Sequence, residues 1–75
     1  MDICVMSEIN HLLAVKIRRL RKNKGLSQEK FALLAEIDRT YMQSIEKGER
    51  NISVATAAKI SSALGISLSE LFSDL

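Results

Sequence analysis

The sequence predicts an all-α domain of five short helices, and composition and periodicity support this fold class. Apolar residues make up 47% of the chain and aromatic residues only 4%, a balance that suits small helices packed through leucine, isoleucine and alanine. Proline is absent, and apolar residues recur at the three- and four-residue steps of a helix face. With 75 residues there is room for one domain of modest stability, so we expect a single compact domain over residues 1–75.

The first helix is expected from about Ser7 to Lys24, with Gly25 as its C-terminal cap. Its apolar face is spaced in helical steps and consists of Ile9, Leu12, Leu13, Ile17 and Leu20. The second half of this helix carries six basic residues within nine positions, namely Lys16, Arg18, Arg19, Arg21, Lys22 and Lys24. Such a run fits either a solvated helix face or an anionic partner, and by itself it does not decide between them.

The second helix is expected to begin after Ser27, whose hydroxyl can accept hydrogen bonds from the free N–H groups of the first turn. Its predicted inner face contains Phe31, Ala32, Leu34 and Ala35. A break follows around Glu36 and Ile37.

The third helix is expected to begin after Asp38, a good N-cap residue, and to end near Gly48. Met42 and Ile45 form its inner face. The polar side chains of this helix are left pointing outward, namely Arg39, Thr40, Gln43 and Ser44.

The fourth helix is expected between Ser53 as N-cap and Gly65 as C-cap. Its predicted buried positions are Val54, Ala57, Ile60, Ser61 and Leu64. The sequence SLSEL then opens a fifth, short helical segment near the C-terminus.

The second and third helices, with the short turn between them over about residues 27–47, form a helix-turn-helix arrangement. A helix about 10–12 Å across fits the DNA major groove, which is about 12 Å wide, and its N-terminal residues come closest to the bases. Arg39 can donate two hydrogen bonds to guanine, and the methyl group of Thr40 can pack on thymine. Tyr41 can contact DNA or pack on a neighbouring helix. Asp38 is expected to cap the helix and is a candidate for orienting Arg39.

The segment GLSQEKFALLAEIDRTYMQSIEKGERNIS, followed by KISSALGISLSELF, resembles the helix-turn-helix domain of the lambda and 434 repressor and Cro group, the XRE-type family. The resemblance extends from about Ile17 to Phe72 and implies a lambda-repressor-like DNA-binding domain. Within this group, IDRTYMQSIEKGERN is also similar to the small controller proteins of restriction–modification systems.

The resemblance implies roles for individual residues. Bases would be read by the head of the third helix, through Arg39, Thr40 and Ser44. Tyr41 is a further candidate base contact on its own chemistry, with packing against a neighbouring helix or the dimer partner as the alternative. The DNA backbone would be contacted by Gln28, Arg50 and Asn51. Gln43 and Lys47 are added to these backbone contacts because they are polar or basic and lie on the expected DNA side of the third helix. Arg21 and Glu46 would form a buried ion pair between the first and third helices.

Two departures from the family pattern are expected to have structural consequences. Many members have glycine where this chain has Glu36, so a positive φ there would cost about 1 kcal/mol. Many members have proline where Ile52 stands, and we expect Ile52 to pack on the core.

A single helix-turn-helix unit reads only a few base pairs, so we expect a homodimer on a near-palindromic operator, with recognition helices about 34 Å apart. The C-terminal segment, about residues 64–75, is unusually apolar. We assign Leu68, Phe72 and Leu75 to the dimer interface, together with the C-terminal end of the fourth helix.

The expected function is transcriptional regulation, most like a controller protein that activates and represses its own promoter. A phage or chromosomal repressor and a DNA-binding antitoxin are alternatives, and a protein-interaction module is a third reading. RNA polymerase is a candidate partner through Glu29 and Glu36. No small-molecule ligand is expected, since the chain ends where a sensing domain would begin.

Enzymatic activity, a metal site and other cofactors are not expected. The single cysteine, Cys4, and the single histidine, His11, cannot assemble a zinc site or an internal disulfide. No nucleophile–base set or phosphate-binding glycine loop is recognisable. Without a signal-peptide pattern or an apolar run approaching 18 residues, we expect a cytoplasmic protein with no membrane association.

Overall fold

The computed structural model describes residues 3–75, and side chains from residue 8 onward. The described chain contains five α-helices and no strand, which confirms the all-α fold class. These helices are α1 (Ile3–Asn23), α2 (Gln28–Ala35), α3 (Arg39–Glu46), α4 (Val54–Leu64) and α5 (Leu68–Phe72). The first helix begins at Ile3 rather than near Ser7, because no capping or helix-breaking residue interrupts the segment before Ser7.

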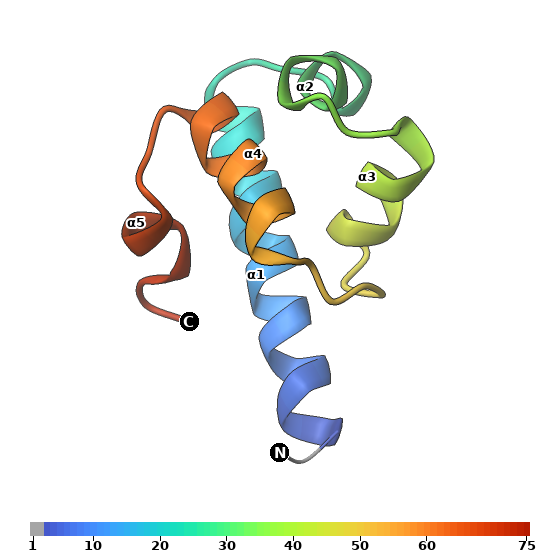
Figure 1. The fold of residues 1–75 in the computed structure, drawn as a ribbon, viewed down its shortest axis with the longest axis vertical. Helices are drawn as coiled ribbons and strands as arrows, with labels where there is room; N and C mark the ends of the chain where they lie inside the picture. The colour runs from blue at the N-terminus through green and yellow to red at the C-terminus, as the bar shows by residue number, and fades with distance from the viewer. Residues whose placement is uncertain (1–2) are drawn as a thin grey trace.

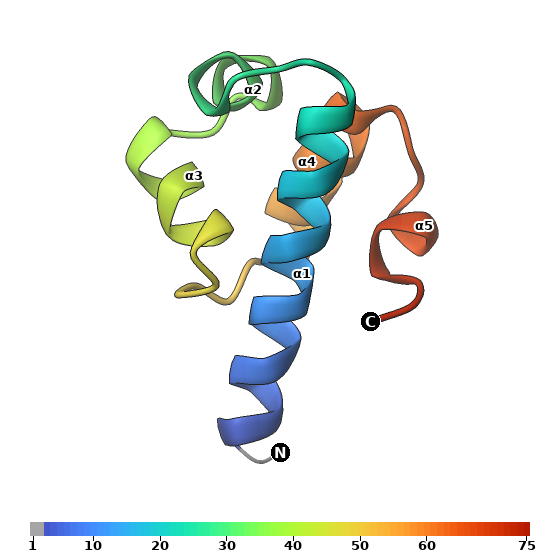
Figure 2. The ribbon, with the colours of Figure 1, turned by 180° about the vertical axis from the view of Figure 1, so that it is seen from behind.

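Helix α1 is the central element of the fold (Figure 1). It packs against α3 on one side and against α5 on the other, and its N-terminal end projects beyond the other helices in both views (Figures 1 and 2). Helix α2 contacts α3 and α4, and α4 contacts α5. The helix-turn-helix pair, α2 and α3, therefore lies on the side of α1 that is away from the C-terminal helix.

The hydrophobic core lies where these helices meet, and its most buried large side chains are Phe31, Ile17, Met42, Ile60 and Leu71. The expected inner faces are wrong at Leu34 and Val54, which are 56% and 77% exposed. Helix α2 buries a narrow stripe of Phe31, Ala32 and Ala35, and Leu34 lies outside this arc. Val54 is the first residue of α4, at the helix end, where the neighbouring helices do not cover it.

Side-chain caps fix where the helices begin, as the sequence predicts. The hydroxyl of Ser27 accepts a hydrogen bond from the amide of Lys30 at 3.1 Å, and that of Ser53 accepts one from the amide of Thr56 at 3.1 Å. Each bond satisfies an N–H group that has no partner within its own helix. Ser67 caps α5 in the same way and forms a reciprocal capping box with Glu70.

The turn between α2 and α3 is built around Glu36, which adopts the left-handed conformation with φ 58°. The amide of Ile37 donates to the carbonyl of Ala32 at 2.9 Å, which ends α2 as in a Schellman motif. The buried side chain of Ile37 closes this turn against the core. Glu36 thus adopts the positive φ whose cost the sequence analysis considered, and this is a strained conformation for a residue with a side chain.

No helix in the described part of the chain is both long enough and apolar enough to span a bilayer. Among the side chains that the structure describes, which begin at residue 8, no group of three or more histidine, cysteine, aspartate and glutamate residues is placed so that it could hold a metal ion. Cys4 lies outside the residues whose side chains the structure describes.

Candidate nucleic-acid interface

The N-terminal turn of α3 exposes Arg39 and Thr40, while Met42 and Ile45 attach the opposite side of the helix to the core. Asp38 caps this turn, because its Oδ2 accepts hydrogen bonds from the amides of Thr40 at 3.0 Å and Tyr41 at 3.3 Å. These bonds confirm Asp38 as the cap and occupy the amides that could otherwise have bound a phosphate. The head of α3 therefore presents its side chains to a ligand more than the amides of Thr40 and Tyr41.

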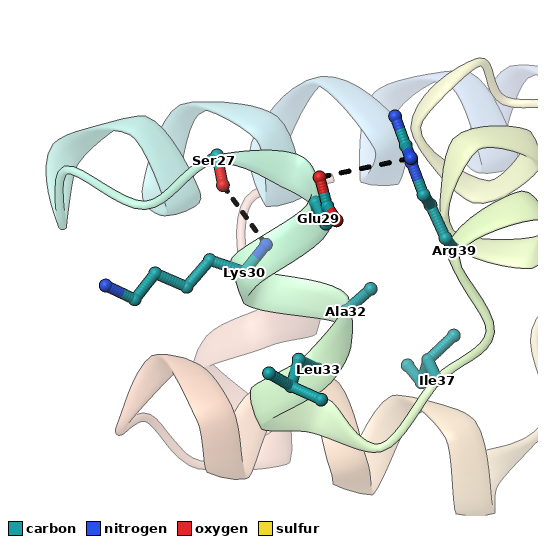
Figure 3. Close-up of a pocket in the computed structure, with 7 residues that line it drawn as sticks. All are labelled: Ser27, Glu29, Lys30, Ala32, Leu33, Ile37 and Arg39. Carbon is teal, nitrogen blue, oxygen red and sulfur yellow. Dashed lines mark hydrogen bonds and ion pairs between the residues drawn. The ribbon is translucent and has the colours of Figure 1, made fainter.

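Arg39 extends from the start of α3 toward α2, where its Nη1 lies 3.9 Å from Oε2 of Glu29 (Figure 3). Both side chains line a shallow groove between α2 and the α2–α3 turn, together with Ser27, Lys30, Ala32, Leu33 and Ile37. Because the two side chains are largely exposed, such a pair contributes at most about 1 kcal/mol. Arg39 is therefore held loosely and can turn to another acceptor. The carboxylate that lies beside Arg39 is that of Glu29. Asp38 does not orient Arg39, because its carboxylate is bonded to the amides of its own helix.

Tyr41 and Ser44 occupy the flanks of α3 and are both half-buried. Tyr41 packs against the edge of the core, and the guanidinium carbon of Arg50 lies 5.8 Å from the centre of its ring, within cation–π range. The hydroxyl of Ser44 donates to the carbonyl of Thr40 at 3.3 Å, which leaves its oxygen able to accept a further bond.

A buried ion pair joins α1 to α3 between Arg21 and Glu46, the two residues that the family resemblance pairs. Nε of Arg21 donates to Oε2 of Glu46 at 2.7 Å, and Nη2 donates to Oε1 at 2.9 Å. The remaining nitrogen, Nη1, donates to the carbonyl of Leu26 at 2.8 Å. This bidentate pairing of the planar guanidinium and carboxylate groups fixes the position of α3 against α1.

Gln28, the first residue of α2, is tied to the same ion pair. Its Nε2 donates to Oε1 of Glu46 at 3.2 Å, so Glu46 receives hydrogen bonds from α1 and from α2. This bond uses one of the two Nε2 hydrogens and leaves the amide oxygen and one N–H for other partners. Sequence analysis did not predict the link between Gln28 and Glu46, which are 18 residues apart.

A polar hollow beside this ion pair brings together residues from α1, α2 and α3. Its lining consists of Arg18, Arg21, Lys22, Gln28, Gln43, Glu46 and Lys47. Three of the predicted backbone contacts, Gln28, Gln43 and Lys47, therefore share one surface with Arg18 and Lys22 from the basic run. The sequence analysis did not single out Arg18 and Lys22, because their positions in the basic run fit a solvated helix face equally well. Arg50 and Asn51 do not line this hollow.

Arg50 and Asn51 lie in the loop between α3 and α4, which the N-terminal half of α1 supports. Nδ2 of Asn10 donates to Oδ1 of Asn51. Gly48 has φ 76° and lies so close to α1 that a Cβ atom there would come within 3.1 Å of Cα of His11. His11 is thus part of a helix–loop contact. This support for the loop depends on residues about 40 positions apart, and no local sequence signal predicts it.

The residues assigned to a dimer interface differ in exposure. Phe72 and Leu75 are 45% and 36% exposed, whereas Leu68 is half-buried against the core. Helix α5 is held to α1 by Lys16, whose Nζ donates to the carbonyls of Glu70 and Ser73, each at 2.6 Å. Phe72 and Leu75 are therefore exposed on a segment that is fixed in place.

Comparison with known proteins identifies the family. The family model for helix-turn-helix proteins matches residues 17–71, and the chain belongs to this family of DNA-binding transcriptional regulators. Its relatives include control protein C.MunI from Mycoplasma, 52% identical over 93% of this chain and 96% of that protein, and control protein C.BamHI from Bacillus amyloliquefaciens, 41% identical over 87% and 82%.

Among solved structures, the restriction-modification controller protein C.AhdI from Aeromonas hydrophila superimposes with a TM-score of 0.81. It is 41% identical, and the match covers 84% of this chain and 96% of that one. The lambda-repressor-like fold and the resemblance to controller proteins are thus confirmed.

Proposed function

We propose that this protein is a restriction–modification controller, which binds as a homodimer to a near-palindromic operator and first activates and then represses its own promoter. The observation that carries the proposal is that Arg39 and Thr40 are exposed at the head of α3, next to the polar hollow that contains Arg18, Lys22 and Lys47. The similarity to control proteins over nearly the whole chain supports the controller role.

In this proposal the first turn of α3 enters the major groove. Arg39 leaves Glu29 and donates two hydrogen bonds to a guanine, and Thr40 contacts the neighbouring base. Ser44 lies one turn further along the same helix, and its free acceptor capacity supports a base contact. Tyr41 presents only part of its surface, so it contributes a smaller contact through its ring edge or hydroxyl.

The DNA backbone is contacted on both sides of α3. Gln28, Gln43 and Lys47 bind phosphates from the polar hollow, where the N-terminus of α2 adds a favourable dipole. Arg50 and Asn51 bind phosphates from the α3–α4 loop. Because Gln28 is bonded to Glu46, its phosphate contact has a fixed orientation and sets the register of α3 in the groove.

Homodimerisation brings two copies of α3 to half-sites about 34 Å apart. Exposed Phe72 and Leu75 provide apolar surface for this contact, with a smaller part from Leu68. We also propose that the protein contacts RNA polymerase through Glu29 and Glu36, both of which are exposed. The proposed location is the cytoplasm.

Selection of binding sequences from a random duplex pool tests this function. The purified protein should enrich a two-fold symmetric site, and that site should occur upstream of the protein's own gene. Arg39→Ala should lose one position of the preferred sequence, whereas the matched control Lys59→Ala, an exposed change on α4, should select the same site as the unaltered protein. Recovery of no preferred sequence would overturn the proposal.

A further inference from the structure

Helix α1 carries an exposed apolar stripe that runs from near its N-terminal end to the level of the C-terminal end of the chain. Ile9, Leu12 and Val15 are 39%, 41% and 42% exposed. Leu12 and Val15 line a groove of about 280 Å³ that α1 forms with the C-terminal end of the chain, together with Lys16, Arg19, Asp74 and Leu75. The C-terminal segment and α3 lie on opposite sides of α1 (Figures 1 and 2), so this groove faces away from the recognition helix.

The order of residues along one line of α1, which passes through this groove and continues beyond it to Glu8, is self-complementary. Glu8, Leu12, Val15 and Arg19 follow one another at steps of four, three and four residues, which places them in one line along the helix. The line is acidic at its N-terminal end, apolar in the middle and basic at its C-terminal end. If two copies of α1 pair antiparallel about an axis between positions 13 and 14, Leu12 faces Val15 of the second copy.

In the same register Glu8 faces Arg19 of the second copy, because positions 8 and 19 are equally far from that axis. A two-fold interface requires this relation, in which residue i contacts residue j and j contacts i. The line from Glu8 through Leu12 and Val15 to Arg19 therefore matches a second copy of itself in both charge and hydrophobicity.

We infer that a second copy of this chain covers the stripe, with α1 packed antiparallel against α1 of its partner, and that the interface continues across Leu75 to Phe72. This inference rests on the homodimer in the proposed function and adds the surface that completes it. Because α3 lies on the other side of α1, such a dimer leaves both recognition helices free for DNA.

The size of the interface supports the involvement of α1. A stable protein–protein contact removes about 800 Å² of surface from each partner, roughly a sixth of the 4878 Å² of this chain. Helix α5 has only five residues, of which Leu71 is buried and Leu68 half-buried. Phe72 and Leu75 cannot supply that area alone, whereas the adjoining stripe on α1 extends the apolar surface over two further helical turns.

A charge swap tests this interface, with the dimer dissociation constant measured by sedimentation equilibrium in about 0.1 M salt. Arg19→Glu should raise the dissociation constant roughly tenfold, because both symmetric ion pairs become repulsive. Adding Glu8→Arg to that variant restores opposite charges across the axis and should bring the constant back close to its original value. Lys59→Glu, the same charge change at an exposed site on α4, should have no comparable effect.

The outcomes separate this inference from the proposed function. A dimer that is weakened equally by Arg19→Glu and Lys59→Glu would overturn the α1 interface and leave the homodimer standing. Failure of the double variant to recover would also overturn it, because the antiparallel register requires that recovery. A chain that remains monomeric at all concentrations would overturn the homodimer itself.

A cross-link provides a second measurement if Arg19→Glu disturbs folding. In a Cys4→Ser background, Leu12→Cys mixed with Val15→Cys should form an intermolecular disulfide under mild oxidation, and Leu12→Cys mixed with Lys59→Cys should not. Equal yields from the two mixtures would overturn the inference.

Discussion

Replacing Glu46 with leucine should remove much of the stability of this domain. Glu46 accepts hydrogen bonds from Arg21 Nε at 2.7 Å, from Arg21 Nη2 at 2.9 Å and from Gln28 at 3.2 Å. Both members of the ion pair are buried, so Glu46→Leu leaves a guanidinium charge in a desolvated site with only the carbonyl of Leu26 as partner. Removing one partner of a buried pair typically costs about 3–5 kcal/mol.

This loss of about 3–5 kcal/mol is large relative to the total free energy of unfolding. A domain of 75 residues is expected to unfold with a free energy of about 4–11 kcal/mol, at about 0.05–0.15 kcal/mol per residue. Urea unfolding followed by helical circular dichroism should therefore show a much lower midpoint for Glu46→Leu. The slope of the transition should stay similar, because the surface exposed on unfolding changes little.

A double-mutant cycle separates the loss of the pair from the burial of a lone charge. Arg21→Met combined with Glu46→Leu replaces the ion pair by apolar side chains and removes the stranded charge, so it should be more stable than Glu46→Leu by about 2 kcal/mol or more. Two results would refute the reasoning. One is a cost below about 1 kcal/mol for Glu46→Leu, and the other is a double variant no more stable than that single variant.

Other predictions concern the DNA contacts, the turn and the C-terminal segment. Arg39→Ala should cost about 1–3 kcal/mol of binding free energy and relax preference at one base pair, measured by fluorescence anisotropy on a set of single-base operator variants. Arg50→Ala should weaken all sites alike and lower the salt dependence of binding by about one charge; equal behaviour of the two variants on every sequence would make Arg39 a phosphate contact. Glu36→Gly should raise the unfolding free energy by about 0.5–1 kcal/mol by relieving the positive φ, and a loss of stability in the same urea assay would contradict the strain argument. Phe72→Asp combined with Leu75→Asp should give a folded monomer by sedimentation, whereas an unchanged dimer mass would place the interface elsewhere.

The sequence by itself determined where the second, third and fourth helices begin and end. Ser27, Asp38 and Ser53 cap amides only two or three residues away, so their role depends on local geometry that any chain carrying these residues can form. The beginning of α1 was misplaced because the apolar pattern that predicts this helix starts at Ile9, whereas the helix itself begins at Ile3. The cost of a positive φ at Glu36 could be stated from the sequence, whereas the structure decided that this residue adopts it.

Only the tertiary structure decided which side chains share a surface. Leu34 and Val54 follow a helical pattern but lie outside the packed faces, because burial depends on where neighbouring helices lie. The pairing of Arg39 with Glu29, the bond from Gln28 to Glu46 and the support of Asn51 by Asn10 likewise join separate elements. Capping is decided within one helical turn, whereas these contacts depend on the relative positions of whole helices. Those positions are set by packing of the entire core.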